Sequence, residues 1–146
     1  MTTSLIEAEA SNPATVCRLH VIPPQRILVT GTSDVDPRLV RDALTDAWHD
    51  LTMIYGPAVR MVVMHGDEAA GAVAVARDWA AEHGVSEEPH AGGGIYRHGA
   101  PVARVPAMLE HADMCLAFIG PDDRPAQATA RLARRAGIPV RYCGTA

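Results

Sequence analysis

Three turns carry the residue types best suited to holding a small ligand. Apolar runs end at turns 30–34, 65–68 and 120–123, and each turn contains a glycine. Glycine lets the backbone approach a ligand closely, and a helix that follows offers free N–H groups and a positive dipole end to a phosphate or carboxylate. The ligand-binding residues predicted in or just after these turns are Gly31, Thr32, Ser33, Asp34, His65, Gly66, Asp67, Gly71 and Gly120.

The alternative is that these glycines only make tight turns, because glycine is the commonest turn residue in every fold. Turns that converge on one edge of a sheet favour a ligand site more strongly than any single turn does. Whether the three turns form a ligand site therefore depends on how the predicted strands and helices arrange them.

Segments of helical periodicity separate the apolar runs. After Asp36-Pro37, an N-cap followed by proline, apolar residues recur at i, i+3 and i+4 until Gly56-Pro57, which predicts an amphipathic helix. Buried strands are predicted at 27–29, 61–64 and 114–119. The other predicted elements are helices at 68–83, 105–111 and 125–136 and short strands at 85–90 and 139–143.

The alternation of strands and helices predicts an α/β fold, a Rossmann-like three-layer sandwich with a mainly parallel sheet of about five strands. Ligands bind such sheets outside the carboxyl ends of the strands, near the point where strand order reverses. The length of 146 residues suits one domain, predicted at 25–146. A flexible, proline-containing arm is predicted at 1–24.

Composition excludes several classes of function. All 13 basic residues are arginine, which excludes a Schiff base and a Walker lysine. With a net charge of −4, this chain is not expected to bind nucleic acid. The three cysteines form no CxxC pair, so we expect no disulfide framework, no metal and no cofactor. Without a membrane-length apolar run or a secretory signal, a cytoplasmic location and no membrane partner are expected.

Other candidate groups each have a simpler interpretation. Arg97 and His98 follow three glycines and could form a lid with an anion-binding arginine, or belong to a surface loop. His65, Asp67 and Glu68 could bind a metal, but an acidic helix start explains them more simply. Arg131, Arg134, Arg135 and Arg141 form a basic cluster that could bind single-stranded DNA or be a solvated helix face. No serine lies in a GxSxG motif, so no catalytic residue is assigned.

Short segments in a fixed order carry a family resemblance. They are Arg26–Asp34 (RILVTGTSD), Val62–Gly66 (VVMHG), Arg97–Gly99 (RHG) with Arg104, Ala112-Asp113, and Gly137–Val140 (GIPV). Together they resemble the YspA/YpsA-related branch of the SLOG superfamily, which also includes LOG-type proteins and the DprA fold. The resemblance implies a Rossmann-like fold and a nucleotide-like ligand, with Arg97 or Arg104 facing its anion.

This chain departs from the family pattern and would be a divergent member. The loop after the fourth strand is usually Gly-Gly-x-Gly-Thr, and here it is Gly120-Pro121-Asp122-Asp123-Arg124. Two carboxylates would repel phosphate there. The glutamate that LOG-type enzymes use has no counterpart after Gly120.

These observations lead to three hypotheses. The first is a binding module, a sensor or sequestering protein, for a nucleotide or nucleotide-derived small molecule. The second is a nucleoside-monophosphate N-glycosidic hydrolase of the LOG type, and the third is a DprA-like DNA-processing accessory protein. Trp48 and Trp79 lie in the apolar stripes of two helices and are either core residues or part of an oligomer interface, and a homo-oligomer is expected. A Gly31→Val variant is expected to lose the ligand and remain folded.

Overall fold

One parallel sheet organises the molecule. The computed structural model describes residues 22–31, 34–66, 71–90 and 108–144. Within them the strand order is β3-β2-β1-β4-β5, and all neighbouring pairs are parallel. The strands are β1 (Gln25–Gly31), β2 (Met61–His65), β3 (Ser86–Pro89), β4 (Met114–Phe118) and β5 (Val140–Tyr142). The helices are α2 (Pro37–Tyr55), α3 (Ala72–His83) and α5 (Arg124–Arg135).

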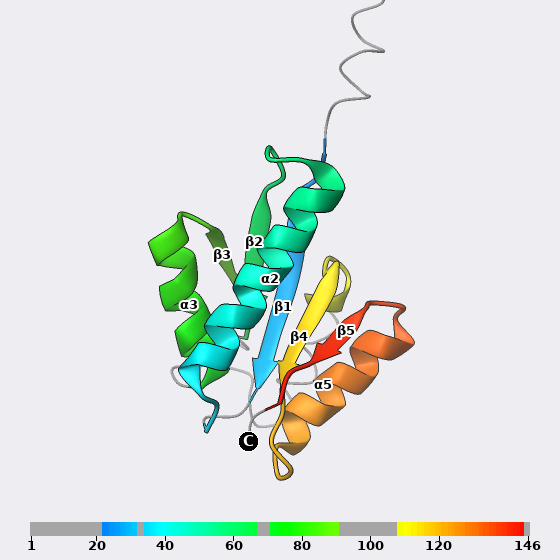
Figure 1. The fold of residues 1–146 in the computed structure, drawn as a ribbon. Helices are drawn as coiled ribbons and strands as arrows, with labels where there is room; N and C mark the ends of the chain where they lie inside the picture. Colours follow the sequence, from blue (N-terminus) through cyan, green and yellow to red (C-terminus); the bar gives the residue numbers. More distant parts are fainter. Residues whose placement is uncertain (1–21, 32–33, 67–70, 91–107, 145–146) are drawn as a thin grey trace, which may run out of the picture.

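Helices cover the sheet on both sides, as alternate residues of β1 show. Ile27 and Val29 belong to the larger apolar cluster, which α2 and α3 complete. Leu28 points the other way into a smaller cluster that includes Ala133 of α5. Because successive side chains of a strand face opposite sides, the two clusters are the two faces of the sheet. The predicted α/β three-layer sandwich is therefore confirmed, and Figure 1 shows α2 crossing in front of β1.

Trp79 is the centre of the α2–α3 face. Its side chain is fully buried, and its indole N–H donates to Thr45 Oγ1 at 3.2 Å. Trp48 meets it edge-on with ring centroids 5.6 Å apart, and His83 stacks on it at 4.5 Å. Of the two roles considered for these tryptophans, the structure assigns core packing to Trp79.

The helix boundaries follow local signals in the sequence. Pro37 opens α2 behind the Asp36 cap, and Gly56, with φ of 95°, ends it. The observed α3 ends at Gly84 as expected, while the predicted start at 68 falls outside the described residues. Of the helix predicted at 105–111, the described part is helical only at Met108 and Leu109.

The C-terminal end of the predicted arm packs against the core. Ile22 packs partly against the larger apolar cluster, whereas residues 1–21 lie outside the described part. No helix in the described ranges is long and apolar enough to span a membrane.

Candidate functional site

Strand order reverses between β1 and β4. From β1 the chain proceeds to β2 and β3 on one side, and β4 and β5 lie on the other. Gly31 pairs with Phe118 at the carboxyl ends of these two central strands. α2, α3 and α5 begin at this edge, the lower one in Figure 1. The geometry is that of a ligand-binding edge in open parallel sheets.

Gly31 is required by packing at this point. A Cβ atom on Gly31 would lie 2.6 Å from the carbonyl oxygen of Phe118 and 3.1 Å from Cβ of Ala72. The backbone oxygen cannot move aside cheaply, so a side chain here would force β1, β4 and α3 apart. The expectation that Gly31→Val would stay folded and lose only the ligand is therefore wrong. The short distance to Ala72 Cβ also shows that the first turn of α3 packs against the end of β1.

The three helix starts at this edge are not equivalent. Asp36 Oδ1 accepts a hydrogen bond from Arg38 N at 2.9 Å and caps α2, and this backbone hydrogen bond holds the pKa of Asp36 below its usual value. Asp123 Oδ1 accepts from Ala126 N at 3.2 Å and caps α5. Both starts are therefore already occupied by a carboxylate, and the expectation that every turn offers free amides to an anion is wrong for these two.

Among the described residues, no carboxylate caps the start of α3. Its N-cap is Gly71, with φ of 76°, and no side chain of the described residues caps it. The first hydrogen bond of this helix within the described part runs from Val75 N to Gly71 O, and the carbonyls that would accept from the preceding amides belong to residues outside that part. Gly71 was predicted as a ligand-binding residue, and the structure puts it at the uncapped helix start nearest to Gly31.

A surface hollow of about 360 Å³ lies beside this edge, between the end of β4, α5 and β5. It is lined by Ile119, Gly120, Pro121, Gln127, Arg131 and Tyr142. Gln127 fixes its wall, since the side-chain amide donates to the carbonyl oxygens of Gly120 at 3.4 Å and Pro121 at 3.2 Å. Arg131 lies one helical turn further on and is exposed, as is 56% of Tyr142. The hollow therefore offers a cation, an amide and an aromatic ring.

Sequence reasoning placed only Gly120 of this group in a site. It treated Arg131 as part of a basic helix face and did not consider Gln127 or Tyr142. The available signal was the i, i+4 spacing of Gln127 and Arg131, which puts them on one face of α5. Arg141, grouped with Arg131 in the sequence, instead pairs with Asp50 of α2 at 2.8 Å.

His65 is the last residue of β2, and its side chain lies inside the protein. Its ring is fully buried, and Nε2 lies 2.9 Å from Glu87 Oε2. Arg77 of α3 reaches the same oxygen at 3.0 Å. This histidine therefore ties β2 to the edge strand β3 and to α3. No group of three potential metal ligands occurs among the residues that the structure describes.

The remaining predicted residues fall into two groups. Asp34 is exposed before α2, and Gly66 is buried directly after β2. The predictions that lie outside the described residues are Thr32, Ser33, Asp67, Arg97 and Arg104. They stay predictions.

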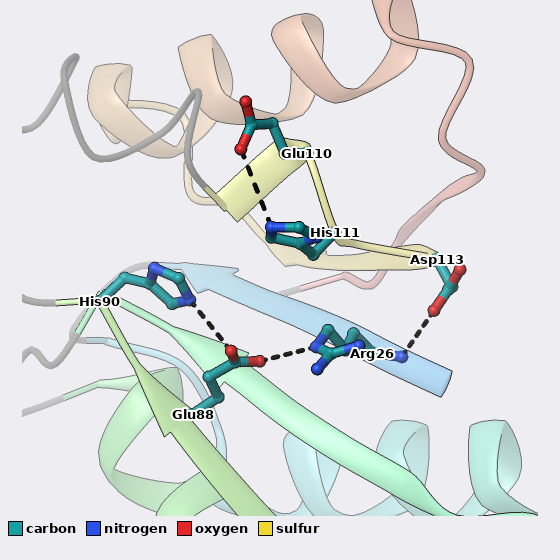
Figure 2. Close-up of polar contacts among 6 residues, drawn as sticks. All are labelled: Arg26, Glu88, His90, Glu110, His111 and Asp113. Carbon is teal, nitrogen blue, oxygen red and sulfur yellow. Dashed lines mark hydrogen bonds and ion pairs between the residues drawn. The ribbon is translucent and has the colours of Figure 1, made fainter. Parts of the chain in front are cut away.

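A second group of titratable side chains lies on the opposite face from α2 and α3 (Figure 2). Glu88 of β3 binds Arg26 Nε through Oε1 at 2.9 Å, and its Oε2 is 3.8 Å from His90 Nε2. That histidine nitrogen is buried without a hydrogen-bond partner in the described part of the chain. Asp113 in turn accepts from Arg26 N at 2.8 Å. These contacts join β1, β3 and the segment before β4, and we call them the polar seam.

Comparison with known proteins gives no relative for this chain. No family model matches it, and neither a curated protein nor a solved structure matches it significantly. The function is therefore inferred from the geometry of the site.

Proposed function

We propose that this protein binds a small anionic molecule with a planar ring, of the nucleotide or nucleotide-derived class, at the carboxyl ends of β1 and β4. The observation that carries the proposal is the position of the hollow, which adjoins the point where strand order reverses. Both are features of ligand sites in open α/β sheets.

Arg131 and the start of α3 support an anionic ligand. Among the described residues that line the hollow, Arg131 is the one charged side chain, and a guanidinium matches a phosphate or carboxylate with two parallel hydrogen bonds. The start of α3, which no described side chain caps, provides backbone amides on the other side of β1. The starts of α2 and α5 are unsuitable because Asp36 and Asp123 occupy them.

Tyr142 supports a ring-bearing ligand. It is one of four large apolar or aromatic side chains exposed in the described residues, and the only one of the four that lines the hollow. An exposed phenol ring on a rigid strand can stack against a nucleobase, a contact worth about 1–3 kcal/mol per base.

A binding role fits the hollow better than hydrolysis does. The lining residues in the described part of the chain include neither a carboxylate nor a histidine, the groups that most often act as general acid or base in cleaving a glycosidic bond. The hydrolase, the DNA-processing accessory, the homo-oligomer and the cytoplasmic location remain predictions from the sequence.

Calorimetric titration of the purified protein with the four ribonucleoside monophosphates tests the proposal. At least one should bind, and Arg131→Met should weaken it about tenfold or more, because a hydrogen bond to a charged group contributes about 1.5–3 kcal/mol. Tyr142→Leu should weaken ring-bearing ligands but spare ribose 5-phosphate. Arg134→Met is the matched control, since Arg134 is exposed on the same helix and lies outside the hollow.

Two outcomes would contradict the proposal. Equal losses in Arg131→Met and Arg134→Met would indicate non-specific attraction to a basic helix and contradict the proposal. Absence of binding by all four nucleotides, with no nucleotide-like compound released from the purified protein by heat and detected by mass spectrometry, would also contradict it.

A further inference from the structure

The last turn of α2 exposes an apolar patch. Met53 is 73% exposed, Ile54 is 70% exposed and Tyr55 is 42% exposed. Met53 and Ile54, which lie next to each other and which we call the α2 patch, are two of the four large exposed apolar or aromatic side chains in the described part of the chain, and Tyr55 is the third. The fourth, Tyr142, lines the hollow. A cluster of this kind at one place marks an interaction surface.

The described chain begins beside this patch. Gln25 N donates to Arg60 O at 2.8 Å, which fixes the start of β1 against the turn that follows α2. Ile22 packs against the larger apolar cluster, which also includes Leu51 of α2 and Val59 of the turn that follows α2. Figure 1 shows the start of β1 and the last turn of α2 together at the upper end of the sheet.

The sequence just before Ile22 has a composition that matches the patch. Cys17, Leu19 and Val21 alternate with Arg18 and His20. Such alternation puts the three apolar side chains on one side of an extended segment. Five extended residues cover about 17 Å, roughly three turns of a helix, so the segment is long enough to cover the patch.

We propose that residues 17–21 dock on the α2 patch of their own chain, with the apolar side chains of Cys17, Leu19 and Val21 against Met53 and Ile54. The occupant is the chain's own segment because it is already tethered at Ile22. The tether makes docking intramolecular, at a high effective concentration, whereas a second copy would have to bind from solution. The site lies at the opposite end of the sheet from the proposed ligand site and is independent of it.

A nitroxide spin label on Cys17 tests the proposal. The protein carries Cys143→Ser, and Cys115 can stay because its thiol is buried and burial raises its pKa to about 12, so it resists labelling. The readout is the methyl spectrum of isotope-labelled isoleucine. Ile54 should lose most of its intensity, whereas Ile119, beyond the other end of β4, should keep most of its intensity.

Two further measurements identify the occupant. Met53→Ser should substantially reduce the loss at Ile54, and it leaves the core intact because Met53 is exposed. Mixing spin-labelled protein without isotope with isotope-labelled protein without spin label should leave Ile54 sharp. Loss of Ile54 intensity in the mixed sample would assign the patch to a second copy. Retained Ile54 intensity in the protein that carries both the spin label and the isotope would show that residues 17–21 do not cover the patch. Either result overturns the proposal.

Discussion

The starts of α3 and α5 lie at the same edge of the sheet, yet they differ in what they leave available. α5 begins with Asp123, whose carboxylate accepts the Ala126 amide, whereas α3 begins with Gly71, and no side chain of the described residues caps it. Both follow a strand and a turn that contains glycine. A helix at the carboxyl end of a strand therefore offers an anion site only if its own cap leaves the amides free.

The largest effect is expected where α3 meets β1. Gly31→Ala places a Cβ atom against the Phe118 carbonyl and should lower the free energy of unfolding by about 1–3 kcal/mol. Gly144→Ala is the control, because nothing lies within 4 Å of its Cβ position, and it should change stability by less than about 0.5 kcal/mol. Urea denaturation measures both. Equal stabilities would mean that Gly31 is not packed closely against β4 and the first turn of α3.

The cap of α5 should contribute less. Asp123→Ala removes the acceptor for Ala126 N and should cost about 1 kcal/mol in thermal or urea unfolding. Asp123→Ser keeps an acceptor and should recover most of that loss. The neighbouring Asp122 is exposed and its side chain makes no cap, so Asp122→Ala should be nearly neutral. If Asp122→Ala and Asp123→Ala cost the same, the two helix starts do not differ in the way described.

Removing the charge at α5 should also strengthen ligand binding. Asp123→Ser eliminates a carboxylate near the hollow while the cap remains, so a nucleoside monophosphate should bind about two- to fivefold more tightly, the equivalent of a helix-dipole contribution of 0.3–1 kcal/mol. A nucleoside without phosphate should show no gain. Calorimetry on the two ligands makes the comparison, and an equal gain for both would rule out an electrostatic cause.

The smallest effect concerns the cap of α2 and depends on pH. The hydrogen bond from Arg38 N holds the pKa of Asp36 below its usual value in the folded protein. The ionised carboxylate therefore contributes stability above the ordinary pKa of an aspartate, and the contribution is lost as pH falls through the lowered pKa. The stability difference between the wild type and Asp36→Asn, measured by urea unfolding, should be constant from pH 5 to 7 and shrink below about pH 4. A difference that grows on acidification would contradict this assignment.

The sequence predicts the sheet well because each buried strand is a short apolar run between turn residues. All five strands and the three described helices occur where periodicity and caps place them, with boundaries shifted by a few residues. The cap at Asp36 was also readable, since Asp-Pro before a helical stripe has a local meaning. Local signals of this kind need no knowledge of neighbouring strands.

The site was less predictable because it depends on contacts between distant segments. The direction of His65 follows from its place in β2 and from Glu87 in β3, 22 residues away. Gln127 and Tyr142 carry no turn or motif signal, and they meet only because α5 packs beside β5. Gly31 was identified, but its packing role requires the position of the Phe118 carbonyl.

The proposed ligand site extends along the edge of the sheet from the start of α3 to the hollow. Nuclear magnetic resonance titration with the ribonucleoside monophosphate that binds most tightly tests whether a ligand occupies it. The backbone amides of Ala72 and Val73 and the side-chain amide of Gln127 should shift together and saturate at one concentration. Shifts confined to the polar seam around Arg26 and Glu88, with these three signals unchanged at saturation, would contradict it.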